Sequence, residues 1–244
     1  MLLTIDAGNT RVKWGVFNAE GIMLEYGACL NADLTTVQLP KAACAVVSNV
    51  AGDKVKALLE KLLVNYSQVN WVKAQTTACG VTNAYVEAET LGTDRWAALI
   101  AAWHISQKPG IVVNAGTAIT IDVLNATGIF LGGTIMPGLR LMRESLNRNA
   151  ARLSVGVGEV KAFPINTQDA IETGCMNAAL ASIMMMAERM QSHHGSPPAI
   201  IITGGDAQII KDNLIAGITN HTLIIDNLVL QGLYLLEKLR NQDA

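Results

Sequence analysis

Short polar side chains surround glycines at the ends of apolar segments in this chain, and such sites could hold a phosphate group. The first is Asp6-Ala-Gly-Asn-Thr10, which follows the apolar residues at 2–5 and precedes a second β-rich segment. The Asp6 carboxylate can hold Mg²⁺ directly or through water, and Asn9 and Thr10 can donate to phosphate oxygens. We expect Gly8 to take backbone dihedrals that a side chain would forbid. Taken alone, the segment could also be an ordinary hairpin turn.

The same pattern recurs 108 residues later, where Asn114-Ala-Gly-Thr-Ala118 follows another apolar segment. A third glycine turn, Thr203-Gly-Gly-Asp206, follows a third apolar segment. Turns of this kind at strand ends suit a nucleotide, two of them around phosphates and one against the nucleoside. The repeat predicts two similar lobes that face each other across a shared nucleotide cleft.

A further polar cluster, Gly92-Thr93-Asp94-Arg95, precedes the apolar helical segment WAALIAAW. Asp94 in a first helical turn has a simple explanation, because a carboxylate there is favourable to the helix dipole. Within a chain that has two phosphate-type turns, Asp94 could instead accept a proton from a primary alcohol. At the ordinary carboxyl pKa it is ionised at neutral pH. Arg95 offers a planar fork suited to a substrate carboxylate.

The elements that must position these residues alternate between strands and helices. We expect strands at 2–6, 11–18, 22–28, 42–48 and 69–73, and helices near 53–65, 94–107, 138–150, 167–191 and 227–240. Thr167 is placed to cap the fourth of these helices. The pattern predicts an α/β fold whose N-terminal lobe is 1–109 and whose C-terminal lobe is 110–244. Arg140, Arg143 and Arg148 are expected to form a solvated helix face.

Composition limits the classes of function. Half of the 244 residues are hydrophobic, 16% are charged and the net charge is −2, so a nucleic-acid partner is not expected. The four cysteines form no C-x-x-C pair, which favours reduced thiols over zinc or disulfides. We expect no membrane-spanning segment and a cytoplasmic location.

Taken together, DAGNT (6–10), LGTDRWAAL (91–99), NAGTAITID (114–122) and GGTIMPGLRLM (132–142) resemble the type III pantothenate kinases, also called the Bvg accessory factor family. NTQDAIETG (166–174) and TGGDA (203–207) extend the resemblance, and 29–80 adds little to it. This family is part of the acetate and sugar kinase, Hsp70 and actin superfamily. The resemblance implies two RNase H-like lobes with mixed sheets flanked by helices.

The resemblance also implies an activity, the phosphorylation of pantothenate by ATP at the first step of coenzyme A biosynthesis. It places Mg²⁺ at Asp6, the proton acceptor at Asp94 and a homodimer with pantothenate near the subunit interface. The implied ATP-binding residues are Asp6, Ala7, Gly8, Asn9, Thr10, Arg11, Val12, Lys13 and Thr117. The implied pantothenate-binding residues are Tyr85, Gly92, Thr93, Asp94, Arg95 and Thr167. Lys13 could equally be a solvated strand lysine.

One position departs from the family pattern. Asn114 stands where the second turn usually has an aspartate associated with a monovalent cation, K⁺ or NH₄⁺. An amide still offers a carbonyl oxygen, but it removes one negative charge. Two other functions remain open from the residues, a non-catalytic nucleotide-binding regulator and a phosphohydrolase of the same superfamily. Nucleotide binding without turnover would favour the first, and phosphate release without pantothenate would favour the second.

Overall fold

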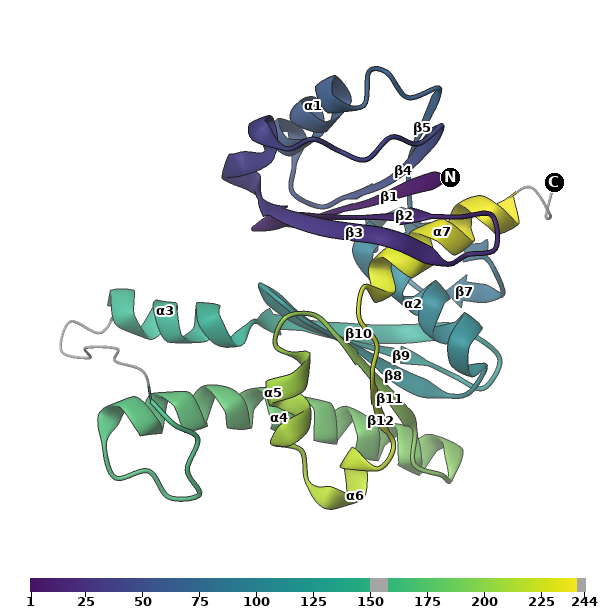
Figure 1. Cartoon of the computed structure of the whole chain (residues 1–244). Coiled ribbons are helices and arrows are strands. Elements are labelled where there is room, and N and C mark those ends of the chain that lie inside the picture. The colour runs from purple at the N-terminus through teal and green to yellow at the C-terminus, as the bar shows by residue number, and fades with distance from the viewer. Residues whose placement is uncertain (150–157, 241–244) are drawn as a thin grey trace. The chain divides into compact units, whose positions relative to one another are not determined.

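The computed structural model describes residues 1–149 and 158–240 of the chain. The chain divides into two compact units (Figure 1). The first contains Met1–Gln107, Thr127–Leu131 and the residues from Asn227 onward, and the second contains Lys108–Ala126 and Gly132–Asp226. The chain therefore leaves the first unit twice and returns to it each time.

The first unit is built on a five-stranded mixed sheet in the order β3-β2-β1-β4-β5. Its central strand β1 is antiparallel to β2 and parallel to β4. Alternate apolar residues of these strands pack with α1 into one core, which includes Leu3, Ile5 and Leu59. Thr4 and Asp6 point to the opposite face, because side chains alternate along a strand. The bounds are β1 Leu2–Ala7, β2 Arg11–Phe17, β3 Met23–Leu30, β4 Cys44–Asn49, β5 Gln68–Trp71 and α1 Asp53–Leu62.

Two helices, α2 (Thr93–Ser106) and α7 (Leu228–Arg240), pack closely together in the first unit. A Cβ built on Gly232 of α7 would lie 1.9 Å from the carbonyl oxygen of Ala97 in α2, so only glycine allows this approach. Figure 1 shows α7 and α1 on opposite sides of the five-stranded sheet. The segment 227–240 was predicted to belong to the C-terminal lobe, whereas this helix packs in the first unit.

Short elements complete the first unit. These are η1 Asn31–Thr36, β6 Thr77–Ala78, β7 Val81–Asn83 and η2 Ala88–Thr90. The start of β10 (Ile129–Pro137) also belongs here, since Ile129 pairs with Thr82 and Phe130 with Asn83 in parallel register. This pairing places Phe130 beside the loop that carries Tyr85.

The second unit contains the strands β12-β11-β8-β9 and the rest of β10. Strand β8 is parallel to β11 and antiparallel to β9, so this sheet is also mixed. Both sheets are flanked by helices, which confirms the predicted α/β class. The bounds are β8 Gly110–Ala115, β9 Ala118–Leu124, β11 Ala199–Thr203, β12 Thr222–Ile224, α3 Leu139–Asn149, α4 Thr167–His194, α5 Ala207–Asp212 and α6 Ala216–Thr219.

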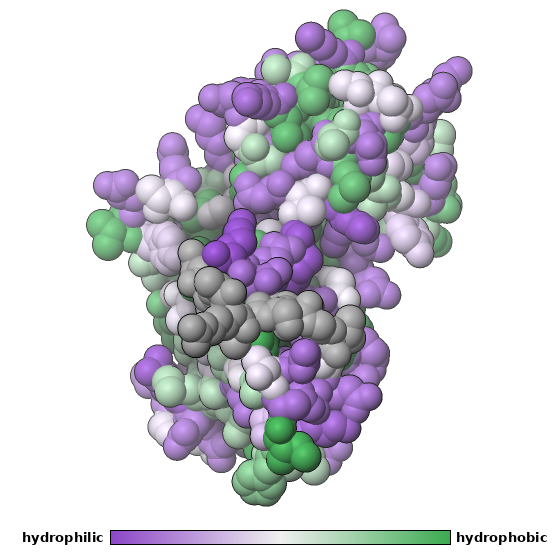
Figure 2. Space-filling model, turned by 90° about the vertical axis from the view of Figure 1, so that its left-hand side faces the viewer, coloured by the Kyte–Doolittle hydropathy of each residue, from purple (hydrophilic) through white to green (hydrophobic). Residues whose placement is uncertain are grey.

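Helix α4 is long and apolar enough, by length and composition, to cross a membrane, and within 1–149 and 158–240 no other helix is. No such segment was predicted from the sequence. Core helices meet the same criteria, and Met176, Ala179 and Ile183 of α4 are fully buried in the second unit's core. Packing therefore accounts for the apolar composition of α4. On the surface drawn in Figure 2, hydrophobic and hydrophilic residues are interspersed.

Candidate active site

Asp6 lies near the end of β1, next to Lys13 of β2 and Ser48 of β4 in the sheet register. Its Oδ1 is buried and has no hydrogen-bond partner. The pKa of this carboxyl is raised to about 7, mainly by burial and also by the charge of Asp94, while the charge of Lys13 opposes the rise. The ordinary carboxyl pKa therefore does not apply to Asp6. A buried, unpartnered carboxylate oxygen near a second carboxylate is a site that a cation would stabilise.

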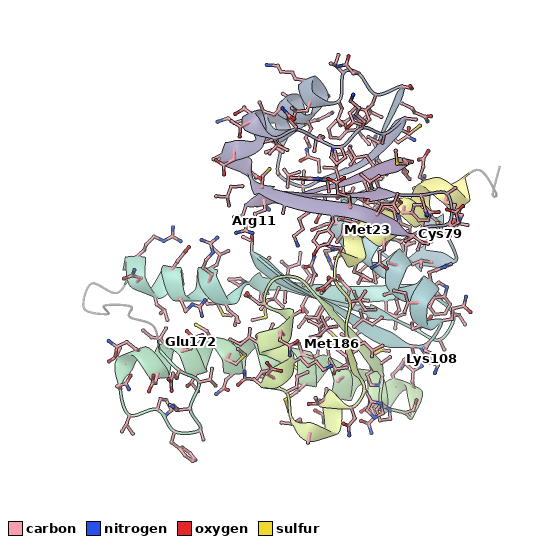
Figure 3. All side chains as sticks on the ribbon, viewed as in Figure 1. Arg11, Met23, Cys79, Lys108, Glu172 and Met186 are labelled. Carbon is pink, nitrogen blue, oxygen red and sulfur yellow. The ribbon has the colours of Figure 1, made fainter. Side chains whose placement is uncertain are left out.

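The turn after Asp6 is fixed by backbone and side-chain hydrogen bonds. Gly8 N donates to the Arg11 carbonyl at 3.0 Å, and Asn31 Nδ2 donates to the Gly8 carbonyl at 3.0 Å. The expectation of unusual dihedrals at Gly8 is wrong, because its φ is not positive and a Cβ would meet only the Arg11 carbonyl, at 3.4 Å. Asn9 and Arg11 are exposed, and Figure 3 shows Arg11 at the start of β2.

Asp94 lies in the first turn of α2, as predicted, with Gly92 as the N-cap residue. Its Oδ1 accepts a hydrogen bond from the Arg95 backbone N–H at 2.8 Å. A Cβ on Gly92 would lie 2.6 Å from that same oxygen, so glycine at this position admits the Asp94 side chain. Burial raises the pKa of Asp94, while the Arg95 N–H and the Arg95 charge oppose the rise. The ordinary pKa assumed from the sequence is too low for this carboxyl as well.

Ser48 lies between the strand that carries Asp6 and the helix that carries Asp94. It was not predicted from the sequence as a site residue. It is fully buried on β4 beside Asp6 in the register, and its Oγ shares a 2.7 Å hydrogen bond with Thr93 Oγ1. The bond fixes the start of α2 against the strand that neighbours β1. The structure thus brings Asp6, Thr93 and Asp94 together in the first unit.

Arg95 is a buried cation whose guanidinium lies among aromatic side chains. Arg95 is only 5% exposed, and its Nη1 donates a hydrogen bond to the Tyr85 hydroxyl at 3.0 Å. Tyr85 and Arg95, two predicted substrate-binding residues, are therefore in direct contact. Asn83, also missed by the sequence analysis, holds the Tyr85 loop by accepting from Tyr85 N and donating to the Ala88 carbonyl.

In the second unit the turns at 114–118 and 203–206 lie against each other, because β8 and β11 are parallel neighbours. Asn114 pairs with Thr203 in the register, and Asp206 N donates to the Ala115 carbonyl at 3.1 Å. Gly204 has a φ of +105°, and a Cβ there would lie 2.2 Å from that carbonyl oxygen. Only glycine fits this contact.

The turn at 116–117 also receives the segment that begins α3. Gly138 N donates to the Thr117 carbonyl at 2.9 Å, and a Cβ on Gly138 would lie 2.1 Å from the Gly116 carbonyl oxygen. Three backbone segments therefore meet around Gly116 and Thr117. Thr117 and Asn114 are both half-buried at this junction.

Arg143 is not part of a solvated face, contrary to the prediction. Its Nη1 lies 2.6 Å from Glu172 Oε1 of α4, and the two side chains are 31% and 12% exposed. Arg140 forms an exposed pair with Glu144 at 2.7 Å. Burial raises the pKa of Asp206, whereas the charges of Arg143 and Arg140 oppose this, so the TGGDA turn lies near both arginines.

Thr167 lies in the second unit, and its predicted role as a helix cap is wrong. Asn166 caps α4 instead, since its side chain accepts from Asp169 N at 2.9 Å. Thr167 is exposed and lines a cavity of about 860 Å³ together with Met142, Pro164, Ile165 and Cys175. Among residues 1–149 and 158–240, no group of three or more His, Cys, Asp or Glu is arranged to hold a metal ion. A metal in the first unit would therefore use few protein ligands.

Comparison with solved structures supports the fold. A Campylobacter jejuni protein described as a putative Baf family transcriptional activator has a TM-score of 0.65, with 22% identity over 99% of this chain and 98% of its own. Component A of the (R)-2-hydroxyglutaryl-CoA dehydratase of Acidaminococcus fermentans has a TM-score of 0.54 and 12% identity, over 97% of this chain and 98% of its own. At these identities the likeness concerns the fold alone.

Comparison of sequences is more specific. The type III pantothenate kinase family model matches residues 2–189. The type III pantothenate kinase of Methylobacillus flagellatus is 42% identical over 97% of this chain and 98% of its own length. That of Nitrosospira multiformis is 37% identical over 100% of this chain and 94% of its own. This chain belongs to the type III pantothenate kinase family.

Proposed function

We propose that this chain transfers the γ-phosphoryl group of ATP to the primary hydroxyl of pantothenate, forming 4′-phosphopantothenate for coenzyme A biosynthesis. The observation that carries the proposal is the pair of carboxylates, Asp6 and Asp94, at the end of β1 and the start of α2, where the charge of Asp94 acts on Asp6. Phosphoryl transfer needs charge neutralisation and positioning more than covalent chemistry. The two carboxylates provide a site for each of these tasks.

Asp6 would hold Mg²⁺, which favours one or two carboxylates together with phosphate oxygens. The unpartnered Asp6 Oδ1 supports such a site. When bound, the ion would neutralise charge on the phosphates. The turn from Ala7 to Lys13 would bind the phosphates through short donors and two cationic side chains, and Thr117 of the second unit would donate to a phosphate oxygen.

Asp94 would accept the proton of the pantothenate hydroxyl as the phosphoryl group arrives. The raised pKa of Asp94 makes it a stronger base than an ordinary carboxylate, provided that it is ionised. Arg95 would bind the pantothenate carboxylate, since it carries a planar set of donors. Gly92, Thr93 and Tyr85 complete the proposed pantothenate site in the first unit.

The monovalent cation is the cofactor for which this chain differs from its family pattern. At Asn114 a K⁺ or NH₄⁺ ion would meet a neutral amide oxygen in place of a carboxylate. We expect the cation to bind weakly and turnover to depend on it little. Turnover measured with and without K⁺, in wild type and Asn114→Asp, tests this, and a dependence that appears only in Asn114→Asp is the expected result.

We further propose that the chain acts in the cytoplasm as a homodimer, with the cavity beside Thr167 near the subunit interface. Phe163 and Ile165 next to this cavity are 90% and 96% exposed, which suits an apolar contact with a second copy. Analytical ultracentrifugation of wild type and of Phe163→Asp tests the assembly. A dimer that the substitution weakens is expected, and a wild-type monomer at assay concentration would contradict it.

Detection of the product tests the proposed reaction. Purified protein with Mg²⁺-ATP and pantothenate is expected to form 4′-phosphopantothenate, identified by mass spectrometry, with stoichiometric ADP. Omission of pantothenate is expected to stop ADP formation. Phosphate release that continues without pantothenate would instead indicate hydrolysis, and nucleotide binding without any turnover would indicate a regulator.

A further inference from the structure

The Arg95 guanidinium lies against two adjacent aromatic rings, only one of which belongs to the predicted site. Its Cζ lies 5.7 Å from the centroid of the Tyr85 ring and 5.8 Å from that of Phe130. The two rings are 5.3 Å apart and tilted by 41°. A cation within about 6 Å of a ring centroid is attracted by the ring quadrupole, more strongly when it is desolvated. Arg95 is desolvated, because it is only 5% exposed.

Phe130 reaches this position through strand pairing. It is fully buried and follows Ile129 at the start of β10, where it pairs with Asn83 of β7. Its carbonyl accepts a hydrogen bond from Ala84 N at 3.2 Å. The residue that follows, Tyr85, then lies beside the Phe130 ring. Tyr85, Arg95 and Phe130 all belong to the first unit, so the arrangement is set within one compact body.

We propose that Phe130 is a positioning residue for pantothenate binding, which holds the Arg95 guanidinium against the Tyr85 ring in the orientation that receives the substrate carboxylate. This inference rests on the proposed function of Arg95. Tyr85 fixes one end of the guanidinium by the 3.0 Å hydrogen bond from Nη1. The face of the Phe130 ring restricts rotation of the guanidinium about this bond. A flexible aliphatic side chain of similar size could fill the volume without this restriction.

The first test compares kinetic constants of Phe130 variants. We expect Phe130→Leu to raise the KM for pantothenate about three- to thirtyfold, with kcat and the KM for ATP nearly unchanged. Phe130→Tyr keeps a ring face and is expected to remain within about twofold of wild type. If Phe130→Leu does not fold, Phe130→Met, which also lacks a ring face, is measured in its place. An unchanged KM for pantothenate in a folded variant without the ring would overturn the proposal.

A matched control separates positioning from general loss of packing. Phe17 is a second buried phenylalanine of the first unit, stacked on Tyr234 with ring centroids 4.9 Å apart. Phe17→Leu is expected to lower the melting temperature as Phe130→Leu does, but to leave the KM for pantothenate unchanged. Equal increases of KM in both variants would assign the effect to stability and refute the proposal.

The second test uses a substrate that lacks the charge. In pantothenol a primary alcohol replaces the carboxylate, so its binding does not depend on the orientation of Arg95. We expect Phe130→Leu to raise the KM for pantothenol by less than twofold. An equal rise for both compounds would overturn the role in carboxylate binding. Product formation by the wild type separates failure of the proposed function from failure of the role of Phe130. If the wild type makes no 4′-phosphopantothenate, the proposed function itself fails.

Discussion

The turn after β1 and the turn after β8 have the same local plan but different chemistry. Each follows a strand and contains a glycine between short polar residues, and each precedes a second antiparallel strand. The first carries Asp6, whose Oδ1 is buried without a hydrogen-bond partner and whose carboxylate lies within reach of the Asp94 charge. The second carries the neutral Asn114 and is held by backbone contacts from Gly138 and Gly204.

The difference indicates how the two units divide their tasks. An unpartnered buried carboxylate is unfavourable for folding and is kept where function requires it. A turn built from close backbone contacts depends instead on glycines, and its side chains carry no charge. We infer that catalytic charge is concentrated in the first unit, whereas the second contributes a rigid, neutral turn.

The largest effect is expected for Asp94. Asp94→Asn removes the proton acceptor but keeps the shape of the side chain, so kcat should fall about 10²- to 10⁴-fold. The control is Asp53→Asn, which changes an exposed aspartate in the first turn of α1. Initial rates of 4′-phosphopantothenate formation are compared, with circular dichroism to verify folding. Near-normal turnover of Asp94→Asn would contradict the assignment of Asp94, in the first unit, as the proton acceptor.

A smaller effect, on stability, is expected for the glycine contact of the second unit. Gly204→Ala places a Cβ 2.2 Å from the Ala115 carbonyl oxygen at a φ of +105°, and we expect it to destabilise the fold by about 1–3 kcal/mol. Gly205 has no heavy atom within 4 Å of such a Cβ, so Gly205→Ala should change stability by less than about 0.5 kcal/mol. Denaturant melts of the two variants measure the difference. Equal stabilities would show that the turn is not held by this contact.

The third effect is the pH dependence of stability that Asp6 confers. Its pKa in the folded chain is about 7, above the ordinary value of 3.8. The protonated group therefore stabilises the ligand-free fold below about pH 4, and this stabilisation is lost as pH rises through about 7. We expect Asp6→Asn to exceed wild type in stability at pH 8 by on the order of 1–2 kcal/mol, and the gap to close at pH 4.

Melting temperatures at pH 4, 6 and 8 without Mg²⁺ measure this dependence. Asp33→Asn serves as the control, because Asp33 is exposed on η1. A gap between Asp6→Asn and wild type that does not change with pH would mean that Asp6 has an ordinary pKa. Added Mg²⁺ should stabilise wild type at pH 8 more than it stabilises Asp6→Asn.

Much of the fold was predictable because local patterns and structure agree. The main strands and helices lie within a few residues of the predicted ranges, and Gly92–Arg95 opens a helix as expected. The short elements β6, β7, β12, α5 and α6 were not predicted, since each is too short to show a hydrophobic period. Helix α7 was assigned to the C-terminal lobe, but it packs against α2 in the first unit. The close approach of Gly232 to Ala97 that allows this packing is not visible in a local sequence pattern.

The site was predictable only where its residues are contiguous. Ser48 and Thr93 are 45 positions apart, and Asn31 and Gly8 are 23 apart, so their hydrogen bonds depend on strand order that no local pattern reveals. Phe130 joins Arg95 through the pairing of β7 with β10. The raised pKa values of Asp6 and Asp94 depend on burial, which is a property of the packed unit.

An exchange of Asp6 and Asn114 tests the comparison between the two turns most directly. The double variant Asp6→Asn with Asn114→Asp keeps the composition and net charge of the chain but moves the carboxylate from the first turn to the second. We predict a loss of 4′-phosphopantothenate formation of at least about 10³-fold at saturating Mg²⁺-ATP, because the carboxylate beside Asp94 is gone. Turnover within tenfold of wild type would contradict the claim that the carboxylates of the first unit perform the chemistry.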